Sequence, residues 1–335
     1  MSWYLHEGDA LTCLREMPAG SVQTCVTSPP YWGLRDYGAE GQLGLEPTPE
    51  QYVANLVAVF REVKRVLRDD GTLWLNLGDS FCSTAPGTRV DPGAMTGKHV
   101  NEGAYRRAAT PPGLKPKDLV GIPWMVAFAL RADGWYLRSD IIWAKPNPMP
   151  ESVTDRPTKA HEYLFLLSKS PRYFYDADAV REPSDRPDLI GRATRNMGPQ
   201  EKTGGVNGGP NLRNDSDRVG VDYCNPAGRN KRSVWTVATQ PFPGSHFAVF
   251  PPKLIEPCVL AGSLPATSDF SIQTRDGLPQ STVLDPFAGA GTTGVVALRH
   301  DRGFIGIELN PEYAEMARNR IRDDAPLMNV GAEAA

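Results

Sequence analysis

The sequence predicts an α/β protein with a Rossmann-like fold: a mixed, mostly parallel sheet with helices on both faces. Short apolar runs alternate with amphipathic segments along most of the 335 residues, which is the pattern of βαβ units. Hydrophobic residues make up 40% of the chain, enough for a sizeable buried core. A glycine-rich turn at 285–294, between an apolar run and the start of a helix, is typical of ligand-binding loops in such folds.

The individual elements follow from their apolar patterns. Residues 49–68 form the clearest helix, because Thr48 can cap it, Pro49 suits its first turn and its apolar residues recur at helical spacing. A second helix is expected from Pro311 to about residue 322, capped by Asn310. The expected strands are 22–27, 72–77, 137–143, 162–167, 282–284 and 304–307.

Two stretches have few large apolar residues and many Gly, Pro, Asn or charged residues. Segments this long without apolar periodicity are uncommon inside a compact domain and are usually functional or disordered. We expect 83–113 to be a flexible loop and 182–232 to be an insert. The remaining segments, 1–181 and 233–335, would then form one catalytic domain.

Charge and composition narrow the class of protein. The net charge is −3, but residues 181–240 hold ten Lys/Arg and seven Asp/Glu, so this segment is basic on an acidic body and suits contact with phosphate. There is neither a long apolar run nor a signal-like N-terminus, so we expect a cytoplasmic protein without a membrane segment. The five cysteines and five histidines lack ligand spacing, so no metal is expected.

The glycine-rich turn has the features of a nucleotide site. Gly289 and Gly291 permit positive φ and close approach of the backbone to a ligand. Thr292 and Thr293 then open a helix whose N–H groups face that ligand. The next apolar run ends in Glu308, a carboxylate that can accept hydrogen bonds from both ribose hydroxyls.

Gly289, Gly291 and Gly294 also match the dinucleotide motif GxGxxG, which by itself is a weak signal. Two features oppose NAD as the ligand. Asp285 stands at the strand end, where it can bind an ammonium group, and only about one helix follows Glu308. Adenosine joined to an amino acid indicates S-adenosylmethionine.

A second distinctive segment, TSPPYW, follows the apolar run at 22–26. The two prolines make the backbone rigid and have no N–H to donate. The Ser28 hydroxyl and a proline carbonyl provide two acceptors for one NH2 group, and Tyr31 offers a flat face for a flipped base. This arrangement suits methylation of an aromatic amine through positioning and electrostatics, without a strong general base.

Together, TSPPYW followed by DPFAGAGTT and GIELN resemble the β class of S-adenosylmethionine-dependent amino DNA methyltransferases of restriction-modification systems. The resemblance spans nearly the whole chain outside 83–113 and 182–232. It implies a circularly permuted order with the base-pocket half first and the cofactor half last, and 182–232 as the target-recognition region. It also implies double-stranded DNA as substrate and base flipping. It allows a cognate restriction endonuclease as partner without requiring one, and leaves monomer and homodimer open.

The resemblance also assigns residues. Asp9 would contact the adenine amino group, Glu308 the ribose, and 246–254 would close over the methionine end. The expected catalytic residues are Ser28, Pro29, Pro30 and Tyr31. The expected cofactor-binding residues are Asp9, Asp285, Phe287, Gly289, Gly291, Thr292, Thr293 and Glu308. The residues expected at the base pocket or in contact with DNA are Trp32, Trp143, Asn147 and His161.

Several alternatives stay open. The family's Ser version is associated with cytosine N4 and its Asp version with adenine N6, so Ser28 favours cytosine, with N6-adenine methylation as the alternative. A catalytically silent DNA-binding protein is a more distant alternative, opposed by the intact motifs. Methylation of RNA or of a protein amide is another, although Asn usually precedes the prolines there. Cys258 lies in an apolar helical pattern without an activating base, which disfavours it as a nucleophile.

Overall fold

The computed structural model divides the chain into two compact units. The larger comprises Met1–Asp176 and Arg232–Ala335, and the smaller comprises Ala177–Lys231. The residues that the structure describes are 2–34, 36, 38–82, 110–184, 227–240, 249–265 and 281–324. Most of the predicted loop 83–113 and of the predicted insert 182–232 lies outside these residues, and their proposed roles stay predictions.

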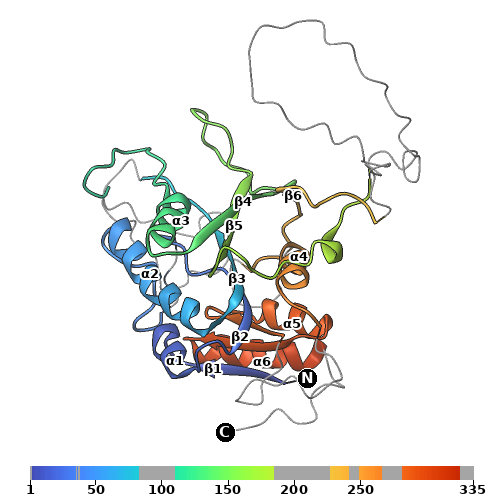
Figure 1. Cartoon of the computed structure of the whole chain (residues 1–335). Helices are drawn as coiled ribbons and strands as arrows, with labels where there is room; N and C mark the ends of the chain where they lie inside the picture. The colour runs from blue at the N-terminus through green and yellow to red at the C-terminus, as the bar shows by residue number, and fades with distance from the viewer. Residues whose placement is uncertain are drawn as a thin grey trace, which may run out of the picture. The chain divides into compact units, whose positions relative to one another are not determined.

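The larger unit is built on an eight-stranded sheet (Figure 1). Across the sheet the strand order is β1-β8-β7-β2-β3-β5-β4-β6. Among these strands only β5 runs antiparallel to its neighbours, which confirms the predicted mixed, mostly parallel sheet. The strands are β1 (Trp3–Glu7), β2 (Val22–Thr27), β3 (Leu67–Leu77), β4 (Tyr136–Ala144), β5 (His161–Ser168), β6 (Val234–Thr236), β7 (Thr282–Asp285) and β8 (Gly303–Glu308).

Helices cover both faces of this sheet, as predicted (Figure 1). On one face α2 packs between α1 and α3, and on the other α5 packs between α4 and α6. No helix in the described part of the chain is both long and apolar enough to span a membrane. The helices are α1 (Ala10–Glu16), α2 (Pro49–Val66), α3 (Ile122–Ala132), α4 (Pro252–Gly262), α5 (Thr292–Arg299) and α6 (Pro311–Asp324). The smaller unit contains a 3-10 helix, η2 (Asp178–Val180), and an antiparallel bridge between Glu182 and Arg229.

Helix α2 begins as the sequence predicts. The Thr48 hydroxyl accepts a hydrogen bond from the Gln51 N–H at 3.3 Å, and Pro49 occupies the first turn. The helix ends at Val66, two residues before the predicted end, because Leu67 is already extended and starts β3. The buried face includes Tyr52, Leu56, Phe60 and Val63, which pack into the core against the sheet.

The central strands are buried along their whole length, which explains why they were predictable. Every residue of β2 and of β7 is buried, and parallel strands covered on both faces appear as continuous apolar runs. The edge strands β1 and β6 were not predicted. Both are short and partly exposed, so their side chains give little apolar signal.

Candidate active site at the carboxyl ends of β2, β7 and β8

The sheet order brings the two distinctive segments together. Strands β2 and β7 are parallel neighbours, with Cys25 paired to Leu284, so the TSPPYW turn and the glycine loop leave the same edge of the sheet. Strand β8 lies on the other side of β7 and ends at Glu308. Ligands bind at this edge in open α/β sheets. The structure brings both segments to the edge where the site was predicted, and binding of the cofactor there stays a prediction.

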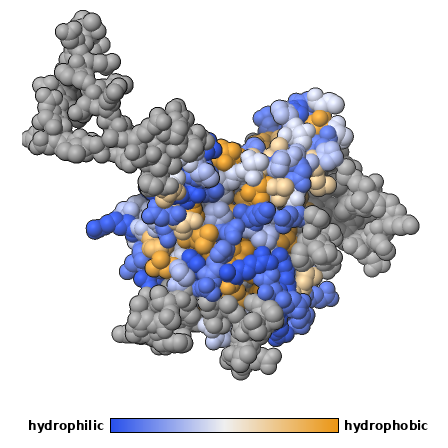
Figure 2. Space-filling model, turned by 90° about the vertical axis from the view of Figure 1, so that its right-hand side faces the viewer, coloured by the Kyte–Doolittle hydropathy of each residue, from blue (hydrophilic) through white to orange (hydrophobic). Residues whose placement is uncertain are grey.

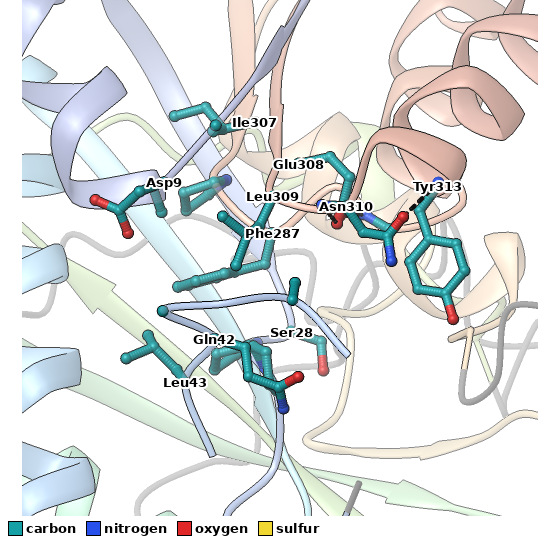
Figure 3. Close-up of a pocket in the computed structure, with 18 of the residues that line it drawn as sticks. Asp9, Ser28, Gln42, Leu43, Phe287, Ile307, Glu308, Leu309, Asn310 and Tyr313 are labelled. Carbon is teal, nitrogen blue, oxygen red and sulfur yellow. Dashed lines mark hydrogen bonds between the residues drawn. The ribbon is translucent and has the colours of Figure 1, made fainter. Parts of the chain in front are cut away.

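A pocket that is partly open to solvent lies at this edge (Figure 3). Apolar side chains of Phe287, Ile307 and Leu309 line it together with the polar groups of Asp9 and Glu308. This combination suits a ligand with an aromatic ring and hydroxyl groups. The predicted site residues on its wall are Asp9, Ser28, Pro29, Pro30, Tyr31, Phe287, Gly289 and Glu308.

The glycine loop is held by Glu308. Gly289 and Gly291 have φ of 51° and 72°, in the left-handed region that glycine adopts easily. The Gly289 N–H donates to Oε2 of Glu308 at 2.8 Å, and the Asn310 N–H donates to Oε1 at 2.8 Å. Burial raises the pKa of Glu308 above its usual value. Because each carboxylate oxygen has further lone pairs, Glu308 can also accept bonds from ribose hydroxyls, so the site fits adenosine.

Asp285 lies behind the pocket wall and is only 1% exposed. Its Oδ1 accepts hydrogen bonds from the Thr27 hydroxyl at 2.6 Å and the Phe287 N–H at 3.1 Å, and its Oδ2 accepts one from the Thr293 hydroxyl at 2.6 Å. Burial raises the pKa of Asp285 to about 6, although these bonds favour the charged form. This geometry favours a role in fixing the loop over the direct contact with an ammonium group that the sequence suggested.

Three other predicted cofactor residues also lie behind the wall. Gly291 precedes the first turn of α5, Thr293 is bonded to Asp285, and the Thr292 hydroxyl accepts a bond from Nη1 of Arg320 at 2.8 Å. These contacts hold the glycine loop on the side that faces away from the pocket. Direct contact of Gly291, Thr292 and Thr293 with the cofactor stays a prediction.

Asp9 combines a structural contact with a place on the pocket wall (Figure 3). Its Oδ1 accepts bonds from the N–H of Thr12 at 2.9 Å and from the Thr12 hydroxyl at 2.8 Å, which caps helix α1. The cap fixes the carboxylate at the rim of the site. Its predicted contact with an adenine amino group stays a prediction.

The proline turn contributes four consecutive residues, Ser28 to Tyr31, to the pocket wall. The Tyr52 hydroxyl, from α2, donates to the Pro30 carbonyl at 2.7 Å. This bond uses one of the two lone pairs of the Pro30 carbonyl oxygen, and the Pro29 carbonyl, next to Ser28 in the chain, is the other candidate acceptor. The sequence alone did not predict the bond between Tyr52 and Pro30, and which carbonyl accepts an amino group stays a prediction.

Tyr31 is anchored through its hydroxyl group. It donates to Oε2 of Glu162 at 2.7 Å and lies 3.1 Å from Oδ1 of Asn76, while the Ser28 hydroxyl lies 3.5 Å away. Burial and the negative charge of Glu162 raise the pKa of Tyr31 well above its usual value. Tyr31 is therefore a neutral phenol at physiological pH.

The four residues expected at the base pocket do not line this pocket. The indole N–H of Trp32 donates to the Glu46 carbonyl at 2.9 Å, and that of Trp143 to the Val237 carbonyl at 2.8 Å. The Asn147 side chain pairs with the backbone of Thr239, and the His161 ring packs edge-on against Tyr163. In this structure Trp32, Trp143 and Asn147 bond to the backbone of other segments. Contact of any of the four residues with a base or DNA stays a prediction.

Several residues of the pocket wall were not predicted from the sequence. Gln42 and Leu43 lie in an irregular segment before α2, and Tyr313 lies in the first turn of α6 (Figure 3). Asn310 was expected only as a helix cap, and its Oδ1 does accept the Glu312 N–H at 2.9 Å. None of these has a local pattern that distinguishes a wall residue from an ordinary loop or helix residue. The segment at 246–254 expected to close over the methionine end lies partly outside the described residues.

Comparison with known proteins identifies the family. A family model described as DNA methylase, of the N6 and N4 type, matches residues 22–319. The type II methyltransferase M.Cfr9I of Citrobacter freundii is 48% identical over 329 residues, covering 98% of this chain and 91% of the relative. M.XycI of Xanthomonas campestris pv. cyanopsidis is 50% identical over 318 residues, covering 95% and 87%.

Solved structures share the fold. The PvuII DNA methyltransferase, described as cytosine-N4-specific, has a TM-score of 0.58 at 17% identity and covers 97% of this chain and 93% of its own. The putative DNA modification methylase TTHA0409 of Thermus thermophilus, solved with S-adenosyl-L-methionine, has a TM-score of 0.55 at 24% identity and covers 97% of both chains. The predicted Rossmann-like methyltransferase fold and the predicted cofactor are confirmed, and the chain belongs to the N6/N4 DNA methylase family, whose cofactor is S-adenosylmethionine.

Proposed function

We propose that this protein is a site-specific DNA methyltransferase that methylates N4 of cytosine in duplex DNA. The observation that carries the proposal is the position of Ser28, whose side chain lies on the pocket wall together with Tyr31 and the glycine loop (Figure 3). In the β class, Ser before the two prolines is associated with cytosine N4. Methylation of adenine N6 is the alternative.

The residues of the turn would act by positioning the amino group. The cofactor supplies an electrophilic methyl group on a positively charged sulfur. The Ser28 hydroxyl and the Pro29 carbonyl would accept the two N–H bonds of the amino group, which draws the nitrogen toward sp³ geometry and directs its lone pair. Tyr31 would stack on the base, and Asp9 and Glu308 would hold the adenosine. No strong general base is required, because the proton can leave after methyl transfer.

The target base must leave the double helix, because its amino nitrogen cannot reach the cofactor while stacked. The segment 182–232 is the proposed recognition region, and the excess of Lys and Arg at 181–240 suits contact with phosphates. The two relatives are named as type II methyltransferases, which supports a role in protecting DNA from a cognate restriction endonuclease. We expect the protein to act in the cytoplasm, as a monomer or a homodimer.

The test is to incubate the protein with tritiated S-adenosylmethionine and unmethylated genomic DNA, digest the DNA to nucleosides and analyse them by mass spectrometry. We expect N4-methylcytosine. N6-methyladenine would overturn the assignment based on Ser28 and keep the reaction class. The absence of any methylated nucleoside, with wild-type protein that binds the cofactor, would contradict the proposal.

A further inference from the structure

We propose that Glu162 is a positioning residue for methyl transfer, which fixes the Tyr31 ring on which the target base stacks. The inference rests on the proposed function, because it assigns Tyr31 to base stacking. Glu162 is the second residue of β5, the one strand that the structure shows antiparallel to its neighbours. It lies 131 positions from Tyr31 in the sequence, so no local motif links the two residues.

Both oxygens of the Glu162 carboxylate are engaged. Oε2 accepts the Tyr31 hydroxyl at 2.7 Å and the side-chain N–H of Asn76 at 3.3 Å. Oε1 accepts a hydrogen bond from the ammonium of Lys145, and both side chains of this ion pair are less than one-fifth exposed. A carboxylate held on both sides has one orientation, so the hydroxyl bonded to it is held as well.

The partners of Glu162 are themselves fixed. The side-chain N–H of Asn76 also lies 3.0 Å from the Tyr163 carbonyl, inside the sheet. The Lys145 ammonium lies 4.3 Å from the centre of the Trp143 ring, a cation–π contact. Trp143, expected at the base pocket, therefore lies behind the ion pair and supports Tyr31 indirectly.

An independent contact fixes the ring itself. Gly78 follows β3, and a Cβ atom added there would lie 2.5 Å from Cε2 and 3.0 Å from Cδ2 of Tyr31. The backbone at Gly78 thus packs directly against the ring, at a distance that only glycine allows. The ring is held at its hydroxyl by Glu162 and along its side by Gly78. Such fixed geometry is what a reaction governed by positioning requires.

The experiment compares Glu162→Ala, Tyr31→Phe and the double variant. Single-turnover methyl transfer is measured at saturating S-adenosylmethionine on unmethylated genomic DNA, and cofactor affinity is measured by calorimetry. We expect each single variant to be slower by about tenfold to hundredfold, the range for a lost charge-assisted hydrogen bond. The double variant should be no slower than the slower single variant, and cofactor affinity should not change. Multiplicative losses, or a wild-type rate for Glu162→Ala, would overturn the proposal.

Two further variants keep the test decisive if Glu162→Ala does not fold. Glu162→Gln retains an oxygen acceptor for the Tyr31 hydroxyl and should be faster than Glu162→Ala. Gly78→Ala displaces the ring without touching Glu162 and should be slow with unchanged cofactor affinity. Wild-type rates for both Glu162→Gln and Gly78→Ala would overturn the proposal. Glu62→Gln, which removes a comparably exposed carboxylate paired with Arg65 on α2, is the matched control.

NMR spectroscopy tests whether Glu162 fixes the Tyr31 ring without relying on methyl transfer. In protein with ¹³C-labelled tyrosine rings, the two sides of the Tyr31 ring should give separate NMR signals, identified by their loss in Tyr31→Phe. Glu162→Ala should merge them into one averaged signal, and unchanged signals would overturn the proposal. N6-methyladenine or no product from the wild-type protein would count against the proposed function alone, since the ring signals still test Glu162.

Discussion

Thr27 and Asp285 are 258 positions apart in the chain and are joined by a hydrogen bond of 2.6 Å between Oγ1 and Oδ1. The bond links the end of β2 to the end of β7. The proline turn that follows β2 and the glycine loop that follows β7 therefore share a buried anchor, so a displacement of one segment would displace the other. The anchor lowers the free energy of unfolding when Asp285 is charged, because burial disfavours the charged form of its side chain.

Asp285→Asn should reveal this cost through the pH dependence of stability. Burial raises the pKa of Asp285 from 3.8 to about 6 in the folded protein. The unfolded chain thus loses its proton more readily, and the wild type loses stability as the pH rises from about 4 to about 6, by about 3 kcal/mol in total. An uncharged amide avoids this loss, and the Thr293 hydroxyl can accept from it while donating to the Val26 carbonyl, 3.3 Å away.

Urea unfolding at several pH values measures the effect. The free energy of unfolding of Asp285→Asn relative to the wild type should rise by about 1 kcal/mol between pH 5 and pH 7, a little under half of the whole effect. Asp301→Asn, which removes a carboxylate at an exposed turn after α5, is the control variant. A constant difference between wild type and Asp285→Asn across this range would contradict the raised pKa.

Glu308→Ala should weaken cofactor binding. The carboxylate is the proposed acceptor for the ribose hydroxyls, and it also holds the Gly289 N–H of the loop. The loss of charge-assisted hydrogen bonds should raise the Kd for S-adenosylmethionine by about tenfold to hundredfold in calorimetry. Glu312→Ala, at an exposed position in the first turn of α6, should bind normally. An unchanged Kd for Glu308→Ala would refute the ribose assignment.

The sequence predicted that the TSPPYW turn and the glycine loop lie side by side, because the strand before each of them is a recognisable apolar run. Strands β2 and β7 are buried on both faces, and Gly289 and Gly291 require a backbone that few other residues adopt. The edge strands β1 and β6 lacked such a signal, since half-exposed short strands resemble loops.

The direction of the Asp285 side chain was not predictable. A carboxylate at a strand end has the same sequence context whether it faces a ligand or the Thr27 hydroxyl of a distant strand. The same limit applies to Glu162 and Tyr31, which meet only because β5 returns antiparallel beside β3. Long-range pairing of this kind depends on the sheet order, and residue patterns along the chain do not encode it locally.

Tyr52→Phe should lower stability by removing the hydrogen bond to the Pro30 carbonyl. The phenyl ring remains in the core, so the loss should be about 1 kcal/mol, the usual contribution of one hydrogen bond. Urea denaturation gives the value. Tyr136→Phe is the control, because Tyr136 is 44% exposed. Its free energy of unfolding should be close to that of the wild type. Equal stability of the two variants would show that the Pro30 carbonyl needs no internal partner.

Neutralising basic residues of 182–232 should weaken DNA binding in a salt-dependent way. Arg192, Arg195, Lys202 and Arg213 are candidates from the sequence. Each lost phosphate contact should reduce the slope of log affinity against log salt concentration by about 0.9. Fluorescence anisotropy with duplex DNA at several salt concentrations measures this slope. If Gln at all four positions left affinity and slope unchanged, the recognition role of the segment would be wrong.

Ser28→Ala separates the chemical step from cofactor binding. Its hydroxyl is the proposed acceptor for one amino N–H, so its loss should lower kcat by about hundredfold, as for other groups that stabilise a transition state electrostatically. The Kd for S-adenosylmethionine should stay the same, because Glu308 and Asp9 are the proposed partners of the adenosine. Ser139→Ala on β4, whose hydroxyl bonds to the Asp140 carbonyl, is the control and should retain normal turnover. A parallel loss of turnover and cofactor affinity would place Ser28 in the cofactor site and remove the basis for assigning cytosine N4.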